Sequence, residues 1–236
     1  MRDVNPPHRT NVAWSLAILE VDSALSTKNL GRIAQELSQR PAKEFEAQTV
    51  ANATGAFACM DMLGDSNVLN WLNRNDNLPI DRTNLADARQ FHDVLVTWRQ
   101  SNDPMLQMPP LLKLITDGNW IEPLIGNRRN DFPSSQTHLN IARSLELLGC
   151  HCANEILTPL GFSVDILATT PSGLRVHIEV DGPTHFLSDN VTPTGRTLFK
   201  RRLLSKSLGT VRWINVSQYE QMSEVERQNE LKRLLG

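Results

Sequence analysis

The sequence predicts an α+β protein in which a helical N-terminal half precedes a smaller unit of mixed helices and strands. In the N-terminal half, apolar and small residues recur at helical spacing, and similar segments return after about 40 residues. From Ser134 onward, short stretches with alternating apolar residues lie between Gly and Pro turns and amphipathic stretches. We therefore expect degenerate helical repeats over 1–100, an irregular connection over 101–133 and an αβββαβα unit over 134–236.

Two segments of the N-terminal half resemble each other. Asn11–Ala17 and Asn52–Ala58 lie 52 − 11 = 41 residues apart, and a weaker copy, Asp87–His92, begins 87 − 52 = 35 residues later. Small side chains let neighbouring helices approach closely, so this pattern is typical of stacked helical hairpins. Three ordinary packed helices are the alternative. The predicted helices cover 11–20, 29–39, 46–63, 66–73 and 84–100, with breaks at Pro41 and Pro79.

The connection is rich in proline and glycine, and a short helix is expected near Leu111–Thr116. Beyond it, a helix over Gln136–Leu148 places Leu139, Ala142, Leu145 and Leu148 on one face and ends at Gly149. The remaining elements follow in order. They are strands over Cys150–Ile156, Phe162–Ala168 and Leu174–Asp181, a helix over Gly195–Leu208, a strand over Val211–Val216 and a helix over Glu224–Leu235.

The third predicted strand carries polar residues on one face, namely Arg175, His177, Glu179 and Asp181. Asp165 of the preceding strand can lie on the same face through hairpin pairing. Carboxylates gathered in this way can hold a divalent cation. The alternative is an ordinary polar sheet face, with Arg175 and His177 neutralising the acids internally.

Charge and cysteine content limit the function classes. The net charge is −2, with 13 basic and 16 acidic residues over 1–133 and 11 and 10 over 134–236, so neither part is a basic nucleic-acid arm. The three cysteines do not form a disulfide framework or a four-ligand zinc set, and buried reduced thiols are expected. No apolar run approaches the roughly 18 residues that span a bilayer, so no membrane association is expected.

One stretch is locally basic. Between Val191 and Tyr219 there is no Asp or Glu, and the six cations are Arg196, Lys200, Arg201, Arg202, Lys206 and Arg212. Arg196 and Lys200 are i, i+4 neighbours on the predicted helix, so both can grip one phosphate backbone. A solvated basic face is the alternative.

The C-terminal motifs resemble a RAP domain. They are Ser134-Ser135-Gln136, Val164-Asp165-Ile166, Ile178-Glu179-Val180-Asp181-Gly182-Pro183-Thr184-His185-Phe186 and Thr194–Leu204, and they stand in RAP-domain order. RAP domains resemble restriction-endonuclease-like folds, so this fold is implied for residues 134–236. The string Asn11-Val12-Ala13-Trp14-Ser15-Leu16-Ala17 similarly resembles the core of octotricopeptide-type repeats.

The RAP resemblance implies an RNA-binding protein of organellar RNA metabolism, mitochondrial with a plastid as the alternative. The near-neutral charge favours a subunit of a larger ribonucleoprotein, such as the mitochondrial ribosome, in contact with rRNA and neighbouring proteins. No cofactor is expected. The N-terminus shows neither a secretory signal nor an Arg-rich presequence, so either a transit peptide has been removed or this is a late piece of a longer protein.

The first alternative function is a Mg²⁺-dependent endoribonuclease of the PD-(D/E)XK type. The resemblance then implies Asp165, Glu179, Asp181 and His185 as catalytic residues, with Asp165 and Glu179 as metal ligands. Asp181 stands where this motif normally has Lys, and His185 is the candidate general base in its place. A second alternative is a structural adaptor that binds no RNA.

Overall fold

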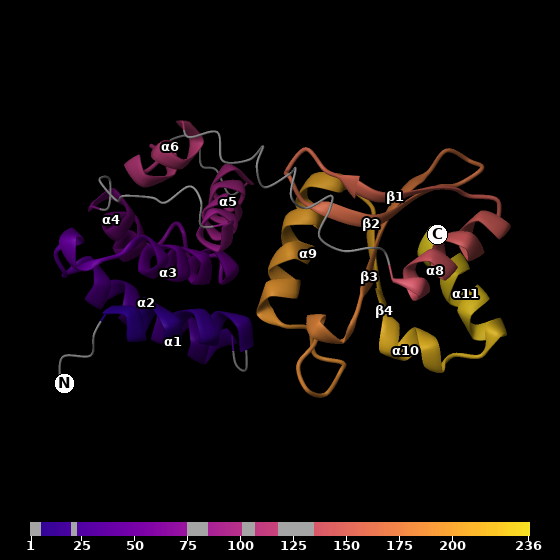
Figure 1. Ribbon diagram of the computed structural model, residues 1–236, viewed down its shortest axis with the longest axis horizontal. Helices are drawn as coiled ribbons and strands as arrows, with labels where there is room; N and C mark the ends of the chain where they lie inside the picture. The colour runs from indigo at the N-terminus through magenta and orange to yellow at the C-terminus, as the bar shows by residue number, and fades with distance from the viewer. Residues whose placement is uncertain (1–5, 20–22, 75–84, 101–106, 118–134) are drawn as a thin grey trace. The chain divides into compact units, whose positions relative to one another are not determined.

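The computed structural model describes residues 6–19, 23–74, 85–100, 107–117 and 135–236, and its fold is α+β, as the sequence predicts. Contacts divide the chain into two compact units, a helical unit and a sheet unit (Figure 1). The helical unit comprises Met1–Leu124 together with Thr194–Leu203, and the sheet unit comprises Ile125–Pro193 together with Leu204–Gly236. Within the described residues, no helix is both long and apolar enough to cross a membrane.

Helices of the helical unit pack against the next helix but one. α1 (Pro6–Leu19) packs against α3 (Ala47–Cys59), and α3 packs against α5 (Leu85–Gln100). In a second row, α2 (Ser23–Ser38) packs against α4 (Ser66–Arg74), and α4 against α6 (Pro110–Asp117). Two such rows are what stacked helical hairpins produce.

The predicted helices of this unit are all present, with shifted ends. α2 begins at Ser23 rather than at residue 29, because the polar stretch before Leu30 carries no apolar stripe that periodicity could detect. A short 3₁₀ helix, η1 (Ala42–Glu44), follows Pro41 where a break is expected. The predicted break at Pro79 lies outside the described residues.

Small residues bring α1 and α3 close together. Ala13 and Ala17 of α1 and Ala53 and Ala56 of α3 are fully buried. At Gly55 the two helices approach closely, since a Cβ added there would lie 2.9 Å from Cζ3 of Trp14. The small-residue pattern in the sequence therefore has the packing role expected of it.

A row of amides links the helices of the first row. Asn52 Nδ2 on α3 donates to Asn11 Oδ1 on α1 at 3.0 Å. Gln90 Nε2 on α5 in turn donates to Asn52 Oδ1 at 3.1 Å. Each helix thus contributes one amide to what we call the amide ladder, formed by Asn11, Asn52 and Gln90.

The sheet unit contains a mixed sheet with the strand order β1-β2-β3-β4. β1 (His151–Leu157), β2 (Ser163–Thr169) and β3 (Arg175–Asp181) are antiparallel neighbours, and β4 (Val211–Asn215) runs parallel to β3. A parallel partner requires a crossover connection, and α9 (Gly195–Leu208) lies within it. By its contacts, most of α9 belongs to the helical unit, as part of Thr194–Leu203, and its last turn belongs to the sheet unit.

The remaining helices of the sheet unit are α8 (Gln136–Leu147), α10 (Val216–Gln221) and α11 (Glu224–Leu235), with the 3₁₀ helix η2 (Pro183–His185) after β3. α10 was not predicted, because it follows β4 with no Gly or Pro between them. Its start is fixed by Asn215, whose Oδ1 accepts a hydrogen bond from Gln218 N at 3.2 Å. The unit is therefore αβββαβαα in order, one short helix more than predicted.

One core joins the sheet to α8 and α11. It contains Ile166, Val176, Ile178 and Ile214 from the strands and Leu231 and Leu234 from α11. The predicted stripe of α8 is wrong at Leu139, which is 40% exposed. The buried residues of α8 are instead His138, Ile141, Ala142 and Leu145, a spacing that fits the 3.6-residue period and includes one imidazole.

Candidate functional site

The predicted acidic residues of β3 are buried at its C-terminal end. Glu179 and Asp181 are each only 2% exposed. η2 returns the chain so that His185 Nδ1 lies 3.0 Å from Asp181 Oδ1, while the imidazole keeps 38% of its surface exposed. A buried carboxylate thus orients a half-exposed imidazole, the arrangement of an oriented general base.

Asp165 sits where β2 and β3 stop pairing. The ladder between these strands runs from Thr169 opposite Arg175 to Ile166 opposite Ile178. Beyond that pair, Asp165 Oδ2 accepts a hydrogen bond from Val180 N at 2.6 Å. The carboxylate therefore takes the place of a backbone acceptor, and the short distance is typical of a charge-assisted bond.

Asp165 gathers with partners that the sequence did not single out. One ligand atom each from His138, Glu155 and Asp165 lie within 4.8 Å of one another. Among the described residues, Glu179 is not a member of this group. The group therefore contains Asp165 but not Glu179, the other predicted metal ligand. His138 could have been noticed as the polar member of a buried stripe, whereas nothing in the sequence marks Glu155.

Arg175 and His177 do not neutralise the β3 acids as the alternative interpretation assumed. Arg175 is exposed. Burial lowers the pKa of His177, and the charge of Arg175 lowers it further, while a hydrogen bond with the Thr210 backbone raises it by less. His177 is therefore neutral at pH 7. Asp181 pairs with His185 instead, at 3.0 Å.

The cysteines of the sheet unit are reduced thiols, as expected. Burial raises the pKa of Cys150. Burial, together with the nearby Cys150 and Glu146, also raises the pKa of Cys152, to about 11. Since the thiolate is the metal ligand and the nucleophile, both thiols are inert at neutral pH.

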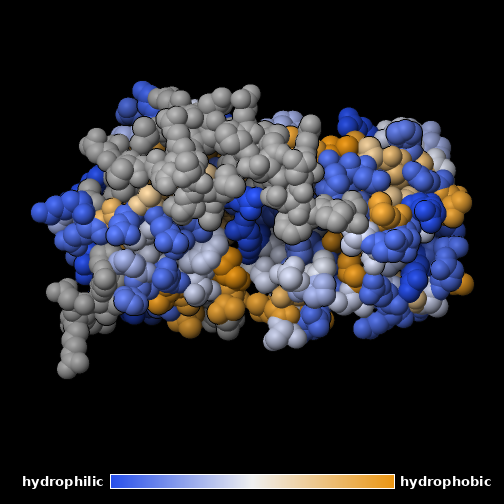
Figure 2. Space-filling view, in the orientation of Figure 1, coloured by the Kyte–Doolittle hydropathy of each residue, from blue (hydrophilic) through white to orange (hydrophobic). Residues whose placement is uncertain are grey.

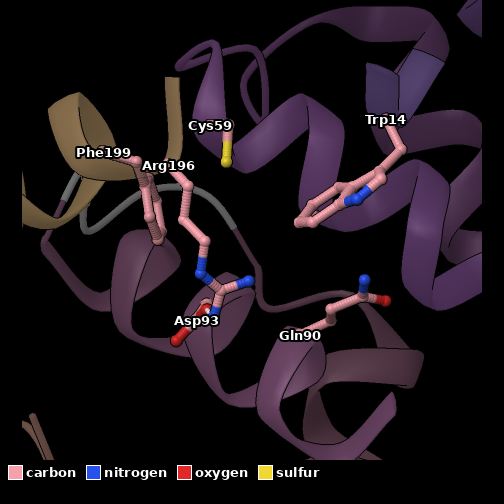
Figure 3. A pocket seen from close by; sticks show the side chains of 7 residues that line it. Trp14, Cys59, Gln90, Asp93, Arg196 and Phe199 are labelled. Carbon is pink, nitrogen blue, oxygen red and sulfur yellow. Dashed lines mark ion pairs between the residues drawn. The ribbon is translucent and has the colours of Figure 1, made fainter. Parts of the chain in front are cut away.

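Arg202 and Arg196, which belong to the six predicted RNA-contacting cations, bind residues of the helical unit. Arg202 donates to the carbonyl oxygens of Ala58 at 2.7 Å and Cys59 at 3.1 Å, which belong to the last turn of α3. These carbonyls lie at the C-terminal end of α3, where a cation also offsets the helix dipole. The Ala58 carbonyl accepts a further hydrogen bond from Asp61 N at 3.1 Å. Arg196 lies 3.7 Å from the buried carboxylate of Asp93 on α5. Figure 3 shows this ion pair at a small indentation between the Trp14 and Phe199 side chains.

The other four cations differ in exposure. Lys206, in the last turn of α9, is exposed, while Lys200 and Arg201 are half-buried. Arg212 on β4 pairs with Ile178 on β3, so it shares a sheet face with that core residue. The visible surface of the sheet unit is mostly hydrophilic with scattered hydrophobic residues (Figure 2). The exposed large hydrophobic side chains of this unit include Leu147 and Val225.

Comparison with known proteins agrees with the motif resemblance over part of the chain. The family model of the RAP domain matches residues 178–234, which extend from β3 to α11. No curated protein matches the sequence. The RAP domain is generally an RNA-binding domain, so the match supports a broad RNA-binding role for this segment. The stretch from β3 to α11, with its basic helix α9, is thus similar to a RAP domain.

Proposed function

We propose that this chain is an RNA-binding subunit of an organellar ribonucleoprotein. The observation that carries the proposal is the RAP-domain match over residues 178–234, because it contains the acid-free basic stretch 191–219. The formal net charge of −2 supports a subunit over a free binder, since a protein of this charge gains little from general attraction to RNA. The mitochondrial ribosome, with rRNA as the contacted strand, is the favoured assembly, and a plastid ribonucleoprotein is the alternative.

Lys206 is the sharpest probe of RNA contact. It is exposed and forms no hydrogen bond or ion pair within the described part of the chain, so a charge reversal there leaves packing intact. Lys232 on α11 is its matched control, another exposed lysine of the same unit. We expect Lys206→Glu to weaken RNA binding about tenfold and to reduce its salt dependence, whereas Lys232→Glu binds as the unchanged protein does.

Crosslinking in organelles, followed by sequencing of the attached RNA, tests both binding and the identity of the RNA. We expect rRNA crosslinks within 191–219 and cosedimentation with ribosomal particles. Recovery of the protein only in fractions without RNA would contradict the proposal and favour the adaptor alternative.

The second candidate is a metal-dependent endoribonuclease, and the Asp181–His185 pair favours it. A carboxylate that is 2% exposed holds the imidazole at 3.0 Å and leaves it partly open to solvent, which suits proton transfer from a bound water. Incubation with organellar RNA and Mg²⁺ tests this candidate. Cleavage that disappears in both Asp165→Ala and His185→Ala, but persists in Lys232→Ala, would establish the nuclease over the binding role.

A further inference from the structure

We propose that His138, Glu155 and Asp165 form a binding site for a divalent first-row transition metal. The three residues come from α8, β1 and β2, all within the sheet unit. Their ligand atoms lie within 4.8 Å of one another. The site differs from the predicted Asp165–Glu179 pair and does not depend on RNA binding.

The orientation of the His138 ring is the first argument. Its Nε2 lies 3.2 Å from Asn154 Oδ1. An amide oxygen can only accept, so Nε2 carries the hydrogen and the neutral ring keeps its lone pair on Nδ1. A histidine that binds a metal almost always donates its other N–H in this way, which fixes both the tautomer and the direction of the ring.

The surroundings of Nδ1 are the second argument. The His138 side chain is only 4% exposed, and Nδ1 lies 3.6 Å from Glu155 Oε1. This distance is longer than a hydrogen bond. In this tautomer the Nδ1 lone pair faces a carboxylate oxygen, and a cation held between these two acceptors would be attracted to both.

The two carboxylates add a further repulsion that a cation would relieve. The β1–β2 register pairs Asn154 with Ile166 and Ile156 with Val164, so Glu155 and Asp165 lie opposite each other. Like charges directly opposite in a sheet are destabilising. Asp165 is also held in place, because its Oδ2 accepts the Val180 N–H at 2.6 Å, while Oδ1 remains for another partner.

The donor set indicates the class of metal. One imidazole nitrogen with two carboxylate oxygens suits Zn²⁺ or Mn²⁺, whereas Mg²⁺ and Ca²⁺ prefer oxygen ligands throughout. Ligands bound at about 2.1 Å lie at most about 4.2 Å apart, so the group closes slightly on binding. Glu155 can make this movement, since its side chain is 46% exposed, and its open side leaves room for water ligands.

The test measures metal binding by the full chain after treatment with a chelator. Calorimetric titration with ZnCl₂ or MnCl₂ should show one saturable site, and saturation should raise the melting temperature by about 5 °C or more. Asp165→Asn keeps an acceptor for Val180 N but removes the charge, and it should weaken binding at least tenfold.

Glu155→Gly should change the melting temperature in the metal-free protein as well as remove the metal-dependent shift. Glu155 has a φ of 51°, which glycine adopts without cost, and the substitution also removes the repulsion from Asp165. The metal-free variant should therefore melt higher than the unchanged protein and show no shift with metal. Asn190→Gly, at a φ of 55° in a loop, is the matched control and should keep the full metal shift.

Two outcomes would overturn the site. One is the absence of saturable binding by the unchanged protein. The other is equal binding by the unchanged protein, Asp165→Asn and Glu155→Gly, which would place any bound metal elsewhere.

Discussion

Asn52 on α3 donates a hydrogen bond to Asn11 on α1 at 3.0 Å, and the two residues are the first positions of the two sequence segments that resemble each other most. Residues 41 apart in the chain therefore meet at equivalent positions of neighbouring helices. The third copy continues the ladder through Gln90, 38 residues from Asn52, rather than through Asp87, the start of the predicted copy.

The first prediction concerns this ladder. In Asn52→Asp the side chain keeps its shape and still accepts from Gln90, but it can no longer donate to Asn11. We expect the free energy of unfolding to fall by about 1 kcal/mol, measured by urea denaturation. The control is Asn70→Asp on α4, where the side chain is exposed and little change is expected. Equal losses in both variants would show that the ladder does not stabilise the helical unit.

A second prediction compares two helical glycines. Gly31→Ala in α2 meets no atom within 4 Å, so the better helix propensity of alanine should stabilise the protein by up to about 1 kcal/mol. Gly55→Ala in α3 places a methyl group 2.9 Å from the Trp14 ring and should destabilise it in spite of the same propensity gain. Thermal unfolding measures both, and a higher melting temperature for Gly55→Ala would contradict the close approach of α1 and α3.

Arg202 separates a structural role from a role in RNA contact. Arg202→Ala leaves the carbonyls of Ala58 and Cys59 without their charged donor, and we expect a loss of about 2 kcal/mol in the free energy of unfolding. Lys206→Ala, four residues further along α9, should leave stability unchanged and weaken RNA binding instead. If Arg202→Ala reduces RNA affinity and its salt dependence while stability stays constant, Arg202 contacts phosphate as the sequence predicted.

The pH dependence of α11 supplies a fourth prediction. Ser223 caps this helix in a reciprocal capping box with Glu226, and the hydrogen bonds from Ser223 lower the pKa of Glu226 below its usual 4.5. The folded-state pKa is thus depressed, so the stabilisation is present above pH 4.5 and is lost as the pH falls through the folded-state value.

Glu226→Gln should accordingly lower the melting temperature at pH 7 and make no difference at a pH below the folded-state pKa. Glu224→Gln, in the same first turn but outside the capping box, is the control for the general effect of removing a negative charge near the helix N-terminus. A difference between Glu226→Gln and the unchanged protein that is the same at both pH values would rule out the ionised capping box.

The sequence by itself determined most elements of this fold, though not α10. Apolar periodicity located α8, α11 and the four strands to within a residue or two, since an element must show one face to a core. It also indicated the polar face of β3 and the RAP-like segment, because both are local patterns. The match over residues 178–234 confirms the RAP resemblance for that segment.

Tertiary structure alone decided which side chains meet. His138 and Glu155 join Asp165 because α8 packs on the hairpin of β1 and β2, a contact that no local pattern encodes. Arg202 was predicted to bind RNA from its place in a basic run, yet the carbonyls to which it donates belong to α3, more than 140 residues away in the chain. Periodicity reports which face of an element is buried, whereas the partner of a polar atom depends on what the fold places beside it.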